Sequence, residues 1–281
     1  NKYYEDIYEE EIQEEIQEDI QKNMQKEIIL FVSEDSIGEG GYSSIYHAHW
    51  KDSGKCVALK EYLFRKDHSV ADNELEVLKH FADKNIKNDY IIEMIGYSML
   101  TDTSKKIYMY IVLELGGINL DEYYSKIYNE FENKKIFFND NEIEIEKIEL
   151  NKSKVLISII KCAAKAIHKF HKYGMHLDIK ATNFVIPQNH NLAEPLKNCK
   201  LIDFNSSRIT NDKQIKIDNL IGTLLYAPPE YINMKATRLM DIYSFGVMIY
   251  KFLNLPNRKF EKDENLDRTL LVGGPLEELA K

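Results

Sequence analysis

His176-Leu177-Asp178-Ile179-Lys180-Ala181-Thr182-Asn183 is the stretch that decides the fold of this chain. It sets a carboxylate, an ammonium and a carboxamide within eight residues. Apolar residues recur at helical spacing from Ser153 to Tyr173 before it, and the strand-like run Phe184-Val185-Ile186 follows it. We therefore predict that residues 176–183, here called the central loop, connect a helix to a short strand. Loops held by rigid elements often contain functional residues.

The spacing of polar residues in the central loop suits phosphoryl transfer. Asp178 could accept the proton of an attacking hydroxyl, while Asn183 and a further Asp hold magnesium. Asp203, in Asp203-Phe204-Asn205, is available as that further Asp. A polar surface loop is the alternative interpretation, and the motifs elsewhere in the chain decide between the two.

The region before the central loop begins with a strand-like pattern. Apolar residues alternate from Ile28 to Leu63, with turn signals at Gly38-Glu39-Gly40-Gly41 and Asp52-Ser53-Gly54, which predicts three antiparallel strands. Glycines in the first turn allow backbone amides to approach phosphate oxygens closely. Val57-Ala58-Leu59-Lys60 then places one lysine near the expected phosphates.

A helix and two more strands are expected next. Residues 70–82 form a predicted helix in which Glu74 could meet Lys60 as a buried pair, with Glu76 as the rival. Strands are predicted at Tyr90–Tyr97 and Ile107–Leu115. Leu115-Gly116-Gly117 interrupts the pattern and is interpreted as a hinge between two lobes.

The order of these motifs resembles the eukaryotic protein-kinase family over residues 30–255, ending with Ala227-Pro228-Pro229-Glu230. The resemblance implies an α+β, two-lobed protein-kinase fold. Its N-lobe would have a five-stranded antiparallel sheet with one main helix, and its C-lobe would be mostly helical. The expected divisions are an acidic amphipathic helical leader at 1–27, an N-lobe at 28–115 and a C-lobe at 116–281, with an insert at 129–150.

The resemblance also assigns roles to matching residues. Asp178 would be the base, Lys180 would steady the transferring phosphate, and Thr223 would orient Asp178. Asn183 and Asp203 would bind Mg²⁺. The residues that would bind ATP are Ile37, Gly38, Gly40, Ile45, Ala58, Lys60, Glu74, Leu113, Glu114, Gly116 and Val185. Leu113 would be the gatekeeper, and the backbone of Glu114 and Gly116 would bind adenine.

A narrower resemblance is to the monopolar-spindle dual-specificity kinases, through the glycine turn, the hinge and an H-x-D without Arg. In that H-x-D, Leu177 replaces the Arg that usually pairs with a phosphate on the segment after Asp203. Candidate phosphosites in this segment are Ser206, Ser207, Thr210 and Thr223. Asn205 replaces the glycine of D-F-G, and Asn tolerates positive φ better than most residues. His176 is expected to pack beneath Phe204.

Two further stretches give structural expectations. Within 129–150, the strict alternation of Glu142 to Glu146 could pair with Ile136-Phe137-Phe138 as a hairpin, and a mobile acidic insert is the alternative. Residues 187–198 are expected to form a solvated loop. Residues 242–253 are apolar nearly all round, so this helix needs cover. We expect a lobe that is incomplete after about residue 255, with an exposed apolar patch and Glu230 without its usual Arg partner.

Composition limits the class of protein. Of the net charge of −9, residues 1–30 contribute −7 and residues 129–150 contribute −4, which leaves about +2 for the remainder. This acidity argues against nucleic-acid binding. Three scattered cysteines indicate neither a disulfide framework nor a zinc site, and no apolar run approaches the roughly 20 residues of a membrane span. We expect an intracellular protein of the cytoplasm or nucleus.

The leader shows apolar residues four apart among Glu and Gln, which predicts an amphipathic helix. It would either bind a regulatory partner or dock on its own domain. The predicted function is ATP-dependent phosphorylation of Ser or Thr in protein substrates, and of Tyr if the narrower resemblance holds. The alternatives are a pseudokinase that acts as a nucleotide-responsive scaffold, and a small-molecule kinase, which Gly222-Thr223 and Ala227-Pro228-Pro229-Glu230 disfavour.

Overall fold

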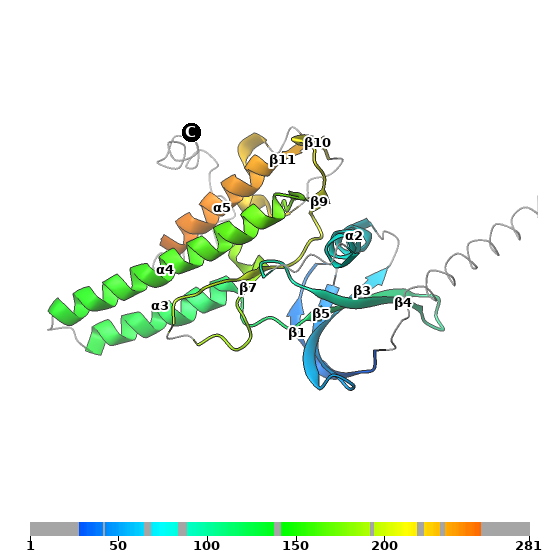
Figure 1. The fold of residues 1–281 in the computed structure, drawn as a ribbon, viewed down its shortest axis with the longest axis horizontal. Helices are drawn as coiled ribbons and strands as arrows, with labels where there is room; N and C mark the ends of the chain where they lie inside the picture. Colours follow the sequence, from blue (N-terminus) through cyan, green and yellow to red (C-terminus); the bar gives the residue numbers. More distant parts are fainter. Residues whose placement is uncertain are drawn as a thin grey trace, which may run out of the picture.

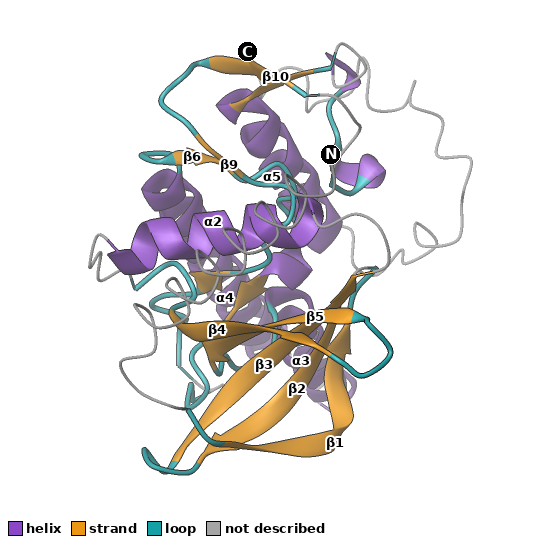
Figure 2. Ribbon diagram, turned by 90° about the vertical axis from the view of Figure 1, so that its right-hand side faces the viewer, coloured by secondary structure: helices purple, strands orange, loops and turns teal. Residues whose placement is uncertain are grey.

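The structure is a computed structural model that describes residues 28–41, 43–64, 69–83, 89–137, 142–191, 194–217, 222–230 and 234–253. The predictions about the leader at 1–27 and about the chain after residue 255 lie outside these residues. In the described part, a five-stranded sheet with one helix against it joins a mostly helical part (Figures 1 and 2). The predicted fold class, a two-lobed protein-kinase fold, is confirmed.

The sheet is antiparallel throughout, with strand order β1-β2-β3-β5-β4. Its strands are β1 (Leu30–Glu39), β2 (Ser43–Trp50), β3 (Lys55–Phe64), β4 (Met94–Thr101) and β5 (Ile107–Glu114). The three predicted N-terminal strands are confirmed. The strand predicted at Tyr90–Tyr97 starts later, at Met94, because Tyr90 to Ile92 bond to the backbone of Leu201 in the helical part instead.

Side-chain alternation along β3 determines what faces helix α2 (Ser69–Asp83). Val57 and Leu59 pack in a small cluster on one face of the sheet, while Ala58 and Tyr62 belong to the main core. Because successive strand residues point to opposite faces, Lys60 shares the face of Ala58 and Tyr62. In Figure 2, α2 lies above this sheet.

Helix α2 confirms the prediction for residues 70–82, with one more residue at each end. Its core-facing residues recur at helical spacing, because the same face returns after three or four residues. Glu74 is 1% exposed within this apolar face, whereas Glu76 lies on the exposed face. The helix therefore presents Glu74 to β3.

The helical part is built on α3 (Leu120–Phe137), α4 (Glu142–Phe170) and α5 (Arg238–Leu253). α3 and α4 lie side by side, and α5 packs against α4 (Figure 1). The buried face of α4 includes Ile159, Ala163, Ala166, Ile167 and Phe170. None of the helices within the described ranges is long and apolar enough to cross a membrane.

The hairpin predicted across residues 136–146 is wrong in the residues that the structure describes. α3 continues to Phe137, and α4 begins at Glu142, so both flanks are helical. Glu, Lys and Ile are compatible with a helix, and ion pairs join the two helices: Lys152 Nζ lies 3.0 Å from Glu132, and Lys135 binds Glu149. The alternation of Glu142 to Glu146 falls in the first turns of α4.

The predicted helix at 242–253 is α5, which begins four residues earlier, at Arg238. Met240, Val247, Met248 and Phe252 are buried, together with the polar residues Asp241 and Ser244. Ile242 is 50% exposed and Leu253 is 62% exposed. The cover expected for this helix falls on residues 254–281, outside the described part of the chain.

Short elements surround the central loop. It leads into β7 (Phe184–Val185), as predicted, but the unpredicted two-residue strand β6 (Gly174–Met175) stands between α4 and the loop. The last residues of the loop form a short 3-10 helix, Ala181–Asn183. Three pairs of short strands lie nearby: β6 with β9 (Arg208–Ile209), β7 with β8 (Lys200–Leu201), and β10 (Gln214–Lys216) with β11 (Lys235–Thr237). A second 3-10 helix, η2, spans Leu224–Tyr226. The paired strands β6 and β7 hold the central loop at its two ends.

Candidate active site

Asp178 is held by three hydrogen-bond donors. Its Oδ1 accepts the backbone N–H of Thr223 at 2.8 Å, and its Oδ2 accepts Lys180 Nζ at 2.8 Å and Asn183 Nδ2 at 3.1 Å. The side chain of Lys180 also donates to Thr223 Oγ1 at 2.9 Å. The four predicted residues are therefore brought together, and the carboxylate has a fixed orientation.

Gly222 makes the contact between Thr223 and the central loop sterically feasible. Its φ is +77°, a left-handed conformation that glycine adopts at little cost. A Cβ at this position would lie 2.2 Å from the carbonyl oxygen of Leu177. The glycine therefore allows the two backbones to approach closely enough for Thr223 to bind Asp178.

Asp241 is a structural anchor of the central loop that the sequence analysis did not identify. It is fully buried, and its carboxylate accepts the backbone N–H of His176 at 2.8 Å and of Leu177 at 2.7 Å. His171 Nε2 lies 2.8 Å from the same carboxylate. An aspartate within an otherwise apolar helix was the available signal, because buried carboxylates require partners.

His176 packs beneath Phe204, as predicted. Both side chains are fully buried, their ring centroids are 5.5 Å apart, and His176 Nε2 lies 3.2 Å from the carbonyl oxygen of Ile202. Phe204 also stacks on Phe170 at 5.4 Å. This aromatic cluster joins the segment that begins at Asp203 to helix α4.

Lys60 forms the second polar centre of the site. Its Nζ lies 2.7 Å and 3.0 Å from the two carboxylate oxygens of Glu74, and 2.9 Å from Oδ1 of Asp203. Lys60 is 3% exposed and Glu74 is 1% exposed. The predicted contact with Glu74 is thus present, and Glu76 makes no part of it.

Electrostatics keep this centre ionised. Burial alone would lower the pKa of Lys60, but the carboxylates of Glu74 and Asp203 outweigh burial and hold that pKa well above its ordinary value. Burial would likewise raise the pKa of Asp203, but the Lys60 ammonium overcomes burial and leaves that pKa below its ordinary value. Both groups are therefore charged at neutral pH.

Asn183 and Asp203 offer a donor set that fits magnesium. Asn183 Nδ2 donates to the backbone oxygen of Asp178 at 2.8 Å as well as to its side chain, so the carboxamide oxygen faces the other way. The Asp203 side chain is 30% exposed, and Lys60 and Asn205 both bind its Oδ1. Carboxylate and carboxamide oxygens are hard ligands of the kind that Mg²⁺ prefers.

The residues predicted to bind ATP lie on or directly after β1, β2, β3, β5 and β7, except Glu74, which lies on α2. Ala58 pairs with Leu113 across β3 and β5, and a Cβ at Gly116 would meet the Val185 side chain at 2.6 Å. In the same region, Gly38 pairs with Ile45, Gly40 donates to Ser43 at 2.8 Å, and Ile37 is 55% exposed. The Glu114 side chain binds Lys200 and the backbone N–H of Glu93.

Two expectations about the segment after Asp203 are wrong. Ser207 is fully buried and donates to the backbone oxygen of His176 at 3.1 Å, and Ser206 is 8% exposed, so neither is an accessible phosphosite. Asn205 does not adopt positive φ. Asp203 has a φ of +65° instead, and Leu177 also has +65°.

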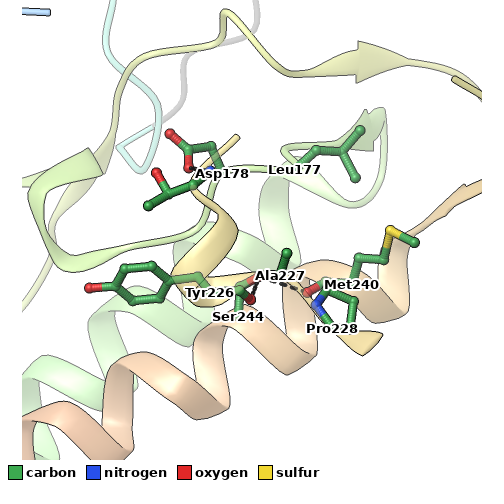
Figure 3. A pocket seen from close by; sticks show the side chains of 8 residues that line it. Leu177, Asp178, Tyr226, Ala227, Pro228, Met240 and Ser244 are labelled. Carbon is green, nitrogen blue, oxygen red and sulfur yellow. Dashed lines mark hydrogen bonds between the residues drawn. The ribbon is translucent and has the colours of Figure 1, made fainter. Parts of the chain in front are cut away.

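A pocket lies beside Asp178 on the side of α5. It is lined by Leu177, Asp178, Thr223, Tyr226, Ala227, Pro228, Met240 and Ser244. Figure 3 shows Asp178 at one side of it and Tyr226, Ala227 and Pro228 along another. Ser244 donates to the backbone oxygen of Tyr226 at 2.8 Å and so ties this wall to α5.

The model of the protein kinase domain family matches residues 31–270 of this chain. That range covers the sheet, the central loop and α5, and the chain belongs to the protein kinase family. The predicted family is thereby confirmed.

Its relatives include receptor kinases of plants. The chain is 24% identical over 227 residues to "Brassinosteroid LRR receptor kinase BRL3" of Oryza sativa subsp. japonica, covering 79% of this chain and 16% of the relative. It is 25% identical over 236 residues to "Cysteine-rich receptor-like protein kinase 2" of Arabidopsis thaliana, covering 79% and 30%. It is 24% identical over 246 residues to "Serine/threonine-protein kinase BRI1-like 1" of Arabidopsis thaliana, covering 84% and 19%.

The chain thus spans less than a third of the length of these curated relatives. None of the three is a monopolar-spindle kinase by its name, and the narrower resemblance is not supported.

Proposed function

We propose that this chain is an ATP-dependent protein kinase that phosphorylates Ser or Thr in protein substrates. The observation that supports this most strongly is the position of Lys60, which binds Glu74 of α2 and Asp203 at once, through contacts of 2.7 Å and 2.9 Å. In phosphoryl transfer, catalysis consists mainly of positioning and charge neutralisation. A lysine held between these two carboxylates could position the phosphates of ATP and neutralise their charge.

The contacts of Asp178 and Lys60 support the following proposed roles. Asp178, held by Thr223, Lys180 and Asn183, accepts the proton of the substrate hydroxyl as that oxygen attacks the γ-phosphate of ATP. Lys180, 2.8 Å from Asp178, neutralises charge on the transferring group. Lys60 binds the phosphates that remain with the nucleotide. When bound, Mg²⁺ supplies charge neutralisation at the phosphates, and Asn183 and Asp203 would hold it.

A peptide substrate is supported by Gly222-Thr223 and Ala227-Pro228-Pro229-Glu230, which resemble the peptide-substrate platform of protein kinases, and Tyr226, Ala227 and Pro228 lie next to the proposed base. A pseudokinase is less favoured, because a scaffold has no chemical need for the full set of Lys60, Glu74, Asp178, Asn183 and Asp203. Phosphorylation of Tyr in addition to Ser and Thr is a more specific prediction that the assay below addresses. The Ser/Thr class is supported by a relative whose name is that of a serine/threonine-protein kinase.

The test is a radiolabelled-ATP assay with Mg²⁺ and peptides that present Ser, Thr or Tyr in one common sequence. The matched control is Asp178→Asn, which keeps the shape of the side chain and removes the base. Transfer by the parent protein and a loss of at least about a hundredfold in Asp178→Asn is the expected result. Equal transfer by both proteins, or ATP binding without transfer by either, would refute the proposal.

A further inference from the structure

Asn73 of α2 joins this helix to the segment after Asp203. Its Nδ2 lies within hydrogen-bond distance of three backbone oxygens, those of Phe204 at 3.0 Å, Asn205 at 2.8 Å and Ser207 at 2.8 Å. Asn73 directly precedes Glu74. The Nδ2 group has two protons and can donate to two of these oxygens at once, which ties the helix to this short segment.

Arg208 completes this contact and extends it to the central loop. Its Nη1 donates to Asn73 Oδ1 at 2.8 Å and to the backbone oxygen of Ser207 at 2.7 Å. Arg208 belongs to β9, which pairs with Met175 in β6, and β6 runs directly into the central loop. A Cβ at Gly174 would lie 2.0 Å from the backbone oxygen of Arg208, so the two strands are in close contact.

Tyr62 makes a second connection between the same parts. Its hydroxyl lies within hydrogen-bond distance of Glu74 and of Asn205 Oδ1, the latter at 2.6 Å, and its single proton can be donated to either. Asn205 Nδ2 donates to Asp203 Oδ1 at 2.8 Å. Because Lys60 binds both Glu74 and Asp203, the five side chains form a ring of close polar contacts, in which the Tyr62 proton makes one of its two possible hydrogen bonds at a time.

We propose that Tyr62, Asn73, Asn205 and Arg208, here called the α2 clasp, position Glu74 and Asp203 for catalysis without a phosphate on residues 203–230. These four are positioning residues that act through Glu74 and Asp203. The inference rests on the proposed kinase function. It concerns the regulation of that function. The clasp holds Glu74 and Asp203 in their catalytic positions, so activity does not require phosphorylation of residues 203–230.

Three observations favour this inference. Leu177 offers no charge to a phosphate, and its side chain is 8% exposed among apolar residues. Ser206 and Ser207, the serines nearest the clasp, are buried. The clasp itself links α2 through the segment after Asp203 to β6, which leads into the central loop.

The test uses the full chain after phosphatase treatment, with mass spectrometry to verify that no phosphate remains. The variants are Tyr62→Phe, which removes one hydroxyl, Asn73→Ala, and Asn205→Gly, which installs the glycine of D-F-G. The controls are Tyr110→Phe, which removes a hydroxyl that interacts with Glu61, and Asp72→Asn on α2, whose side chain is exposed. Neither control belongs to the clasp or to the proposed active site.

Two readouts are required. The first is the pair of kcat and the Mg²⁺ concentration that gives half-maximal activity. Displacement of Asp203 should raise that Mg²⁺ concentration, whereas a smaller amount of folded protein leaves it unchanged. The second is hydrogen exchange of the α2 amides, measured together with Mg·ATP binding, which needs no turnover. We expect the parent protein to be active, and each clasp variant to lose roughly tenfold in kcat, as for one hydrogen bond to a charged group.

The same variants should also show a roughly tenfold faster α2 exchange, while the two controls match the parent protein. A Tyr62→Phe, Asn205→Gly double variant should lose less than the product of the single losses, because both changes break one ring. If another clasp variant proves insoluble, the result for Tyr62→Phe is used to judge the proposal, because this variant removes only one oxygen atom.

Two results would overturn the proposal: a parent protein that is inactive until it is phosphorylated on residues 203–230, or clasp variants with unchanged α2 exchange and unchanged Mg²⁺ dependence. If no protein in the set transfers phosphate, but the clasp variants still accelerate α2 exchange and weaken Mg·ATP binding, the kinase function fails while the clasp is supported as the device that positions Asp203.

Discussion

Replacement of Gly222 by alanine perturbs the proposed active site at one atom. The added Cβ would lie 2.2 Å from the Leu177 carbonyl oxygen, whereas ordinary contacts begin near 3.4 Å. Because packed atoms cannot overlap in this way, the two backbones must separate by about 1 Å. A displacement of that size would lengthen the 2.8 Å bond from Thr223 N to Asp178 Oδ1 to about 3.8 Å, beyond the hydrogen-bond limit.

The cost has two parts. Alanine in a left-handed conformation costs about 1 to 2 kcal/mol of stability. Loss of a hydrogen bond to a carboxylate costs about 1.5 to 3 kcal/mol, and because that carboxylate is the proposed base, we expect kcat/KM to fall roughly 10- to 100-fold. The melting temperature should fall by several degrees, at about 2 to 4 °C per kcal/mol for a domain of this size.

Two other glycines provide matched controls for the Gly222→Ala variant. Gly54 has a φ of +65° and a Cβ there would meet nothing within 4 Å, so Gly54→Ala measures the backbone strain alone. Gly246, on α5, also has open space, and Gly246→Ala should stabilise the helix by up to about 1 kcal/mol. Thermal unfolding and peptide phosphorylation would be measured for all three variants.

The expected pattern is a loss of stability in Gly222→Ala and Gly54→Ala, with a loss of activity in Gly222→Ala alone. If Gly222→Ala keeps more than half of the parent kcat/KM, the contact between Thr223 and Asp178 is not needed for catalysis, and the assigned role of Thr223 is wrong. If Gly54→Ala loses as much activity as Gly222→Ala, the loss reflects general instability.

Three further predictions concern residues outside that contact. Asp241→Asn should cost about 2 to 4 kcal/mol in denaturant unfolding, because two backbone amides of the central loop lose a buried anionic acceptor; an unchanged unfolding midpoint would contradict this. Ser207→Asp should destabilise the protein without activating it, since the hydroxyl is buried against the His176 carbonyl; an active, stable variant would contradict this. A hydrogen bond from Lys152 lowers the pKa of Glu132, so the contribution of Glu132 to stability is fully present above its ordinary pKa and is lost as the pH falls through its lower pKa in the folded protein; the difference in melting temperature between the parent and Glu132→Gln should therefore be present at pH 7 and shrink progressively as the pH falls below the ordinary pKa.

The sequence was sufficient for the features that depend on local pattern. The central loop, the three N-terminal strands and α2 were predictable because apolar periodicity differs between strand and helix, and Glu74 was identified because it shares the inward face of α2 with Leu75 and Leu78. The order of the motifs then indicated the family. Each motif is short and unspecific by itself, but the complete set in this order is specific.

Tertiary contacts explain what the sequence did not reveal. The alternation of Glu142 to Glu146 is also a pattern of good helix formers, and pairing of α4 with α3 selected the helix. Asp241 gave no sign of its partners, because they are backbone amides 64 and 65 residues away. In the sequence, Tyr62 and Asn73 are ordinary polar residues of a strand and a helix. Their roles become visible only in the folded chain, where both contact Asn205.

Leu177 connects these observations. A leucine with a φ of +65° costs about 1 to 2 kcal/mol, and the structure offsets this cost by binding its amide to Asp241 and burying its side chain with Met240 and Ile217. The position where resembling kinases place an arginine to read a phosphate is therefore part of an apolar core here. A buried leucine cannot form an ion pair with a phosphate. The contacts that hold α2 come instead from the α2 clasp, which consists of three neutral side chains and one arginine.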